Sequence, residues 1–442
     1  MDMNGFPERI NVHGYERQVE CQRRLLEESK MRKDNKRLIT NFINFCQNGE
    51  SNIGLSRVRL YYYALRRIGE ITKKNFKKIN EADILSILAK LKEHRICVCK
   101  HERDENGRIK KLVRCNGEKC GGREYSEQTI EDFRKAISKF WRWLYYDKYH
   151  GEAPPPIKRI KVKSNNGKKS PEIYSRDEIK KIIDAMPTVR DKAFFSCLYD
   201  LQCRVGELLS RQIKHVRYNG SGDLELLIES TKTNTEHWET LFESVANFST
   251  WMRLHPRPDD HNAPLWPIIR VGSGRNPLTY DAARMLFLRV CKENGLREGK
   301  KNNIHMLRKS KATHDMADGV PIPYIEARGS WTKGSKALHD CYLLIQDEDK
   351  RNAYKKKYKM KVTNGETNNI ELKMCMRCDS TIENGAKFCP RCGMPADKKV
   401  LAEQKEIRAK VESLIDADML SEMVKKVVLE ELKRKEVEEV KK

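Results

Sequence analysis

Long apolar runs are missing from this 442-residue chain, and their absence argues against a membrane-spanning helix. No stretch approaches the roughly 18 consecutive apolar residues that a span needs. The N-terminal sequence MDMNGFPERINVHG also lacks the apolar segment of a secretory signal. No internal sequence repeat is visible. With 34% charged residues and a mean hydropathy of −0.76, the chain is expected to be a cytosolic protein.

Acidic residues are too few to balance the basic ones, since 63 Asp and Glu face 88 Lys and Arg. The formal net charge is therefore +25. A folded chain tolerates such self-repulsion best when a polyanion neutralises it, although a merely soluble basic surface would give the same composition. The size of the excess favours nucleic acid as the partner.

A single hydrophobic core is too small for this length, so two or more domains are expected. Residues 15–150 predict a helical domain, because apolar residues recur there with the 3.6-residue period of amphipathic helices. The segments with this period are 35–45, 55–71, 82–91 and 126–146, the last of them capped by Ser126. Basic residues interleave with aromatic ones, which is typical of either a solvated face or a DNA-facing surface.

A Gly- and Lys-rich insertion, residues 95–125, interrupts this domain between the third and fourth helices. It contains Cys97, Cys99, Cys115 and Cys120, with His94 and His101 nearby. The cysteine spacing fits zinc knuckles poorly, so a second zinc site and reduced free thiols both remain open.

The basic stretch of residues 151–172 predicts a linker. Three consecutive prolines oppose helix formation, and the Ser-Asn-Asn-Gly sequence opposes burial in a core. Its six Lys and Arg residues would suit a strap that runs along phosphates.

A second domain, of mixed structure, is predicted for residues 173–350. Two strands, 223–229 and 237–242, flank the polar turn STKTNTE and indicate a hairpin. Helices are expected at 176–185, 190–199, 281–294 and 305–319, with Ser175 as the N-cap of the first. The fold class that follows is mainly α with a small β-hairpin or sheet, an α+β arrangement.

Four short motifs in this second domain carry residue types that suit phosphodiester exchange. They are Arg204 and Glu207 in CRVGELLS, Lys232 in the predicted turn, His305 and Arg308 in IHMLRKSKATH, and Trp331 and Tyr342 in RGSWTKGSKALHDCYLL. Arginines grip non-bridging oxygens with a permanent charge, and a proton donor serves the leaving alkoxide. A tyrosine forms a phosphoryl intermediate that a hydroxyl can attack again. Each motif alone is bland, but together, in a strongly basic chain, they favour this chemistry.

In order and spacing, these motifs resemble the tyrosine recombinase (phage integrase) family over residues 15–350. The nearest match is His305-Met-Leu-Arg308 with the Ala-Thr that follows, and Trp331 to Lys336 looks like archaeal members. The resemblance implies that the scissile phosphate is held by Arg204, His305, Arg308 and Trp331. It further implies that Lys232 protonates the leaving 5′-oxygen, that Tyr342 forms a 3′-phosphotyrosyl link, and that Glu207 supports the site.

The resemblance also implies a biological role and partners. Such an enzyme performs site-specific integration, excision or resolution of DNA elements, as a tetramer on double-stranded DNA at the nucleoid. Strand cleavage would need neither a metal nor a nucleotide cofactor, and accessory proteins would be possible partners. Two other functions stay open: a type IB topoisomerase-like relaxing enzyme, and a DNA-binding regulator that has lost catalysis.

Two departures from the family pattern leave the assignment of two roles open. Tyr342 follows Trp331 by 11 residues, a longer gap than the family usually has. Ser330 also separates Gly329 from Trp331. The alternatives are Tyr354 or Tyr324 as the nucleophile, and His339 in the role of Trp331.

Four cysteines after the second domain form two knuckles, Cys375-x-x-Cys378 and Cys389-Pro-Arg-Cys392. Four thiolates at this spacing make a closed tetrahedral zinc site, and closed sites are structural. Residues 370–398 therefore predict a structural zinc ribbon. Residues 401–442 predict a C-terminal helix that either packs on its own body or binds a partner.

Overall fold

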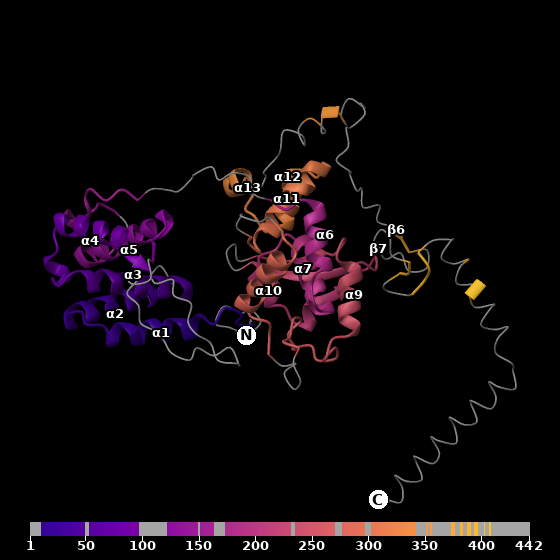
Figure 1. The fold of residues 1–442 in the computed structure, drawn as a ribbon, viewed down its shortest axis with the longest axis horizontal. Helices are drawn as coiled ribbons and strands as arrows, with labels where there is room; N and C mark the ends of the chain where they lie inside the picture. Colours follow the sequence, from indigo (N-terminus) through magenta and orange to yellow (C-terminus); the bar gives the residue numbers. More distant parts are fainter. Residues whose placement is uncertain are drawn as a thin grey trace, which may run out of the picture. The chain divides into compact units, whose positions relative to one another are not determined.

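The computed structural model describes residues 10–48, 53–96, 122–148, 151–162, 173–230, 235–269, 276–296 and 302–341, and short stretches between 351 and 407. The chain forms two compact units (Figure 1). The helical unit is Gly14–Gly167, and the mixed unit combines Lys168–Lys442 with Met1–His13. In the described ranges, no helix is long and apolar enough to cross a membrane.

The helical unit is built around α3, which contacts four other helices. Its helices are α1 (Tyr15–Glu28), α2 (Lys33–Asn48), α3 (Leu55–Ile71), α4 (Glu81–Glu93) and α5 (Glu127–Tyr146). The four predicted helices are confirmed as α2 to α5, and the Ser126 side chain accepts a hydrogen bond from the Thr129 amide as the N-cap of α5. Helix α1 was not predicted, because Leu26 is its one fully buried residue and its surface is charged.

The first half of the predicted linker packs on the helical unit, so that part of the prediction is wrong. Pro155–Ile157 forms the 3₁₀ turn η2, which contacts α4 and α5, and Ile157 is buried in their core. Proline fixes φ near the value that such a turn needs, so the prolines stop a long helix without preventing burial. Residues 163–172 lie outside the described residues.

The insertion is framed by a short antiparallel pair, β1 (Arg95–Ile96) with β2 (Arg123–Glu124). This pairing brings the two ends of the insertion together and returns the chain to α5. The four cysteines of the insertion lie outside the described residues, so the second zinc site stays a prediction.

The mixed unit consists of helices around a small sheet, which confirms the predicted α+β class. Its helices are α6 (Arg176–Asp184), α7 (Val189–Asp200), α8 (Val205–Leu209), α9 (Val245–Arg253), α10 (Tyr280–Glu293), α11 (Met306–Asp318), α12 (Ile322–Arg328) and α13 (Lys336–Cys341). Helix α7 is buried on nearly all sides and contacts α6, α9 and α11 (Figure 1). A helix that is buried all round carries no amphipathic pattern, so α7 serves as the core against which the others pack.

The sheet has three antiparallel strands in the order β3 (Val216–Tyr218), β4 (Leu224–Ser230) and β5 (Thr235–Thr240). Strands β4 and β5 form the predicted hairpin, with Ser230 opposite Thr235 and Ile228 opposite His237. Arg211 anchors β4 to α8, since its side chain pairs with Glu229 at 3.0 Å and donates to the Glu207 carbonyl at 2.9 Å. Both partners of this ion pair are fully buried, so the hairpin is fixed to the turn after α8.

Residues 10–13, which precede the helical unit in the sequence, pack on the mixed unit. Val12 is buried in its core, and the Val12 carbonyl accepts a hydrogen bond of 3.0 Å from the Tyr280 amide. The His13 ring lies 5.0 Å from that of Tyr280. The chain therefore enters the mixed unit twice, which no pattern in the sequence predicted.

In the cysteine module, β6 (Lys373–Met374) pairs with β7 (Thr381–Ile382). Cys375, Ile382 and Cys389 form a small core there. Cys378, Cys392 and nearly all of the predicted C-terminal helix lie outside the described residues.

Candidate active site

Arg204 lies at the start of α8, where Glu207 holds it from two directions. The Glu207 carboxylate accepts a hydrogen bond of 2.7 Å from the Arg204 amide and one of 2.5 Å from the Arg204 Nη1. The same Nη1 donates to Ser230 Oγ at 3.0 Å, at the end of β4. Glu207 is buried, whereas the Arg204 side chain keeps 27% of its surface exposed. The guanidinium is thus oriented from behind and still presents a face to a ligand.

Arg308, one turn into α11, is held by backbone carbonyls from two distant segments. It is 1% exposed and donates to the Gln202 carbonyl at 2.5 Å and to the Gly329 carbonyl at 2.7 Å. The Trp331 ring lies under its guanidinium, 3.9 Å from the Cζ atom. This stack places a delocalised cation on an aromatic face, which stabilises the charge out of water.

The two carbonyls that hold Arg308 belong to strained turns. Gln202 has a φ of 51°, and Ser330, which follows Gly329, also has a φ of 51°. A non-glycine residue in this left-handed region costs energy, so the surroundings must enforce it. For Gln202 the Asp315 carboxylate does so, because it accepts a hydrogen bond from the Gln202 amide group. Such strain is often found at functional sites.

His305 immediately precedes α11, one turn before Arg308. Burial, followed by the charges of Arg308, Lys309 and Arg204, lowers the pKa of His305 to about 4. The imidazole is therefore neutral near pH 7, with one nitrogen that donates and one that accepts. Because Arg308 binds the Gln202 carbonyl, two residues before Arg204, the start of α8 and the start of α11 face the same cluster.

The structure thus brings Arg204, His305, Arg308 and Trp331 together, and it leaves two predicted residues undescribed. Lys232 lies in the sequence between the strand ends Ser230 and Thr235, and Tyr342 directly follows α13, but both fall outside the described residues. Among the alternatives, Tyr324 on α12 is 69% exposed, Tyr354 is 58% exposed, and His339 is exposed on α13. Trp331 rather than His339 makes the contact with Arg308.

Three further polar residues around this cluster were missed by sequence reasoning. Arg328, Asp200 and Glu239 form a buried ionic group directly behind the Gly329 turn. The one sequence feature that could have drawn attention to Arg328 is its position directly before the Gly-Ser-Trp motif. Nothing in the sequence indicates which acids it meets.

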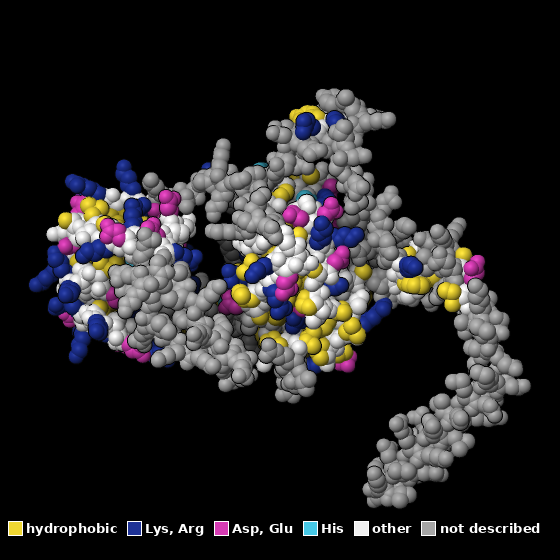
Figure 2. All heavy atoms as spheres, viewed as in Figure 1, with side chains coloured by type: hydrophobic (Ala, Val, Ile, Leu, Met, Phe, Trp, Pro, Cys, Tyr) yellow, Lys and Arg dark blue, Asp and Glu magenta, His cyan; other side chains and the backbone are white. Residues whose placement is uncertain are grey.

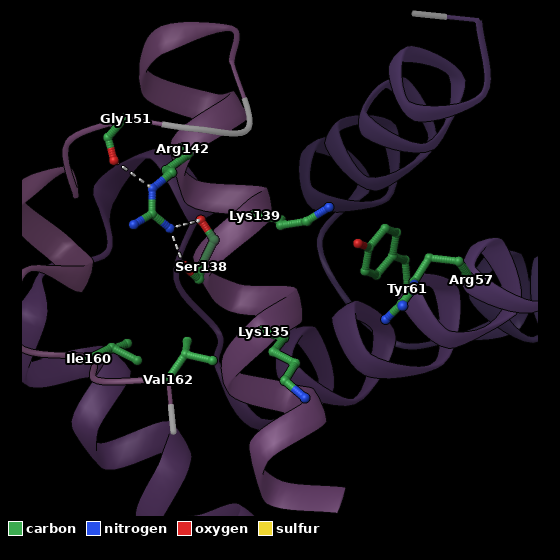
Figure 3. A pocket seen from close by; sticks show the side chains of 9 residues that line it. All are labelled: Arg57, Tyr61, Lys135, Ser138, Lys139, Arg142, Gly151, Ile160 and Val162. Carbon is green, nitrogen blue, oxygen red and sulfur yellow. Dashed lines mark hydrogen bonds between the residues drawn. The ribbon is translucent and has the colours of Figure 1, made fainter. Parts of the chain in front are cut away.

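A basic hollow of about 690 Å³ lies in the helical unit between α3, α5 and residues 151–162. Its lining contains four cationic side chains and no acidic one: Arg57, Lys135, Lys139 and Arg142. Figure 3 shows Lys139 of α5 reaching toward Tyr61 of α3, with Arg142 held by Ser138 and Gly151. In Figure 2, Lys and Arg side chains are spread over the visible face of this unit, with Asp and Glu side chains between them. The hollow suits an anionic ligand such as a phosphate backbone.

Comparisons with known proteins agree with this geometry. Residues 173–344 match the sequence profile of the Phage integrase family. Transposase A of transposon Tn554 from Staphylococcus aureus is 22% identical over 238 residues, which are 52% of this chain and 63% of the transposase. Tyrosine recombinase XerA from Pyrococcus horikoshii is 29% identical over 167 residues, which are 36% of this chain and 52% of XerA.

Among solved structures, a lambda integrase dimer bound to a COC′ core site is similar with a TM-score of 0.50 and 14% identity. The match covers 74% of this chain and 84% of that protein. At this identity the likeness concerns the fold alone. The chain spans less than two thirds of the curated relatives named above. Residues 173–344 of the mixed unit belong to the phage integrase, or tyrosine recombinase, family.

Replacing Gly329 tests the Trp331–Arg308 stack. A Cβ at Gly329 would fall 1.8 Å from Trp331 Cζ3 and 2.2 Å from Cε3, so Gly329→Ala must displace the ring. We expect a loss of about 1–3 kcal/mol in the free energy of unfolding, measured with urea. Gly220→Ala is the control, because a Cβ there meets nothing within 4 Å. Equal stability of the two variants would contradict the close packing of Trp331.

Acidification tests the neutral state of His305. The pKa of His305 is about 4 in the folded chain, against the ordinary value of 6.5 for the unfolded chain. Between these two pH values, the unfolded state therefore binds more protons than the folded state. The free energy of unfolding should therefore fall as the pH drops from about 6.5 to 4, with no further loss from His305 below that. His305→Gln should reduce the difference in unfolding free energy between pH 7 and pH 5. An unchanged difference would mean that His305 is accessible to protons in the folded state.

Proposed function

We propose that this chain is a tyrosine-type site-specific recombinase that cleaves and rejoins DNA through a 3′-phosphotyrosyl intermediate. The observation that carries the proposal is the convergence of Arg204, His305 and Arg308 on one cluster, with Trp331 stacked on Arg308, within a phage integrase domain. Integration, excision and resolution of DNA elements are all compatible with this chemistry.

The proposed reaction divides the work among these residues. The Tyr342 hydroxyl loses its proton to solvent as its oxygen attacks the phosphorus, the bond to the 5′-oxygen breaks, and Lys232 delivers a proton to that oxygen. Arg204, with its exposed guanidinium face, binds a non-bridging oxygen directly. Neutral His305 donates a hydrogen bond, and the buried charge of Arg308 stabilises the pentavalent transition state. Rejoining reverses these steps when a DNA 5′-hydroxyl attacks the phosphotyrosine.

Double-stranded DNA in the nucleoid is the proposed partner. The net charge of +25 and the cationic hollow between α3 and α5 both favour contacts with phosphates. Strand exchange pairs two DNA sites, so we propose that the chain acts as an oligomer on DNA, with a tetramer as the functional form. The lambda integrase of similar fold is described as a dimer on its core site.

We also propose a structural zinc ion held by Cys375, Cys378, Cys389 and Cys392. Cys375 and Cys389 are 1% and 2% exposed and share a small core, as thiolates around a common ion would. Gly393 has a φ of 72°, and its amide donates to the Cys389 carbonyl at 3.0 Å in a tight turn. Within the described residues no three possible ligands come together, since the other two cysteines lie outside them.

From the Trp331 to Lys336 pattern we also propose an affinity with archaeal members of the family. The curated relatives include a bacterial transposase as well as an archaeal recombinase.

Covalent trapping tests the proposed nucleophile. The full chain is incubated with nicked duplexes that contain a random segment, and DNA-linked protein is isolated in detergent. The parent should form an adduct, and mass spectrometry should place the nucleotide on Tyr342. Tyr342→Phe should reduce the adduct by roughly 10³-fold or more, because no other group replaces a nucleophile.

The control variants Tyr354→Phe and Tyr324→Phe should retain the adduct. An adduct that survives in Tyr342→Phe and is lost in one of these would move the nucleophile to that residue. Joined products from two duplexes indicate strand exchange, whereas relaxation of a supercoiled plasmid without joining would favour a topoisomerase-like enzyme. DNA binding with no adduct in the parent would favour a regulator.

Metal analysis tests the ribbon. Cys389→Ser should lower the zinc content of the purified chain by about one ion, because three remaining thiolates leave the tetrahedral site open. Cys21→Ser removes an exposed thiol of α1 and should leave the zinc content unchanged. The same zinc content in parent and Cys389→Ser would overturn the proposed site.

A further inference from the structure

The Arg328 guanidinium joins three elements of the mixed unit. Its Nε donates to the Asp200 carbonyl at 3.1 Å, and its Nη2 donates to Asp200 Oδ1 at 2.9 Å, at the end of α7. It also bonds the end of β5, through the Thr240 carbonyl at 3.0 Å and Glu239 Oε2 at 3.0 Å. Arg328 itself ends α12. A planar side chain with several donors thus locks the hairpin to α7 and α12.

The second Asp200 oxygen extends this lock beyond β5. Asp200 Oδ2 accepts the Phe242 amide at 2.8 Å, the Ser244 amide at 3.0 Å and the Ser244 hydroxyl at 2.8 Å. Burial raises the pKa of Asp200, but the charges of Arg328 and Lys311 outweigh it, so the net shift is downward. The pair is therefore ionised and saturated with hydrogen bonds, the condition under which a buried ion pair holds its geometry.

The hairpin is tied to the active site from both strands. On β4, Ser230 accepts the hydrogen bond from Arg204. On β5, Glu239 and Thr240 bind the Arg328 side chain. The next residue after Arg328 is Gly329, whose carbonyl holds Arg308. Movement of β5 away from Arg328 would thus shift the hairpin relative to Arg204 and Arg308.

We propose that Arg328 is a positioning residue that docks the β4–β5 hairpin against the Arg204–Arg308 cluster. The strand ends Ser230 and Thr235 carry the four-residue segment that contains Lys232. Arg328 binds the opposite end of β5, at Glu239 and Thr240, so it would act on Lys232 through the pairing of β5 with β4. This role rests on the proposed recombinase function, because it requires a leaving group to protonate.

The discriminating variant is Arg328→Lys. Lysine keeps the positive charge beside Asp200, but it cannot reproduce the fork that binds Asp200, Glu239 and Thr240 together. Arg190→Lys is the matched control, since Arg190 is also buried, pairs with Asp191 at 2.9 Å and donates to the Pro267 carbonyl at 2.7 Å. Lys232→Ala shows the effect of losing the proposed acid itself.

The substrates are duplexes whose sequence is recovered from the covalent trapping of the parent chain. The experiment compares two versions of these duplexes, which differ in the leaving atom. One version has the normal bridging 5′-oxygen, and the other has sulfur there. A thiol has a pKa of about 8.5, so sulfur leaves as a thiolate with the electron pair of the broken P–S bond and needs no proton donor. The single-turnover rate of adduct formation and the DNA affinity are measured for each variant.

We expect Arg328→Lys to form the oxygen adduct roughly 10–10³-fold more slowly than the parent, with unchanged DNA affinity. On the sulfur substrate its rate should return to within about threefold of the parent, as for Lys232→Ala, because the missing contribution is proton delivery. Arg190→Lys should keep the oxygen-to-sulfur rate ratio of the parent. Equal losses on both substrates, or no loss on oxygen, would overturn the proposal.

Hydrogen–deuterium exchange of the hairpin gives a readout that does not depend on catalysis. Residues 224–230 and 235–240 should exchange faster in Arg328→Lys and at the parental rate in Arg190→Lys. Unchanged exchange in Arg328→Lys would refute the docking role. A parent chain that forms no adduct would refute the proposed function alone, and the exchange measurement would still test the docking role. Should Arg328→Lys not fold, Glu239→Gln removes the charge on the β5 side and should show both effects more weakly.

Discussion

The burial of the Arg308 guanidinium is the constraint on which the rest of the site depends. A charge this far from water is stable only when its hydrogen-bond donors and its charge find partners in the protein. Here two backbone carbonyls and an aromatic ring supply them. Both carbonyls come from turns with a left-handed residue, so the chain accepts local strain to place them. The segments around Gln202 and Gly329 are thereby required to meet at α11.

The partners of the other buried cations differ from those of Arg308 in an informative way. Arg211 and Arg328 are paired with carboxylates, which cancel their charge and turn them into structural joints. The described contacts of Arg308 are with the Gln202 and Gly329 carbonyls and the Trp331 ring, and burial together with the Arg308 charge lowers the pKa of His305.

Sequence periodicity was sufficient for elements whose burial is one-sided. Helices α2 to α5 and the β4–β5 hairpin followed from apolar spacing, and the spacing of three between His305 and Arg308 placed them one turn apart. Sequence periodicity did not predict the elements whose burial is not one-sided or not helical. Helix α1 buries only Leu26, and the prolines before Ile157 oppose a long helix without opposing burial, so they form a turn that packs on the core.

The ionic group behind the site shows why the remainder was not predictable. Arg328 is 128 residues from Asp200 and 89 from Glu239 in the sequence, and its partners are fixed only when α7, β5 and α12 have packed. A charged residue in a sequence is most often solvated, so its burial has no local signature. Residues that touch a reacting group tend to come in recognisable motifs because chemistry limits their type and order. Residues that position those groups need only the right place in three dimensions, and for them the structure is the first source of information.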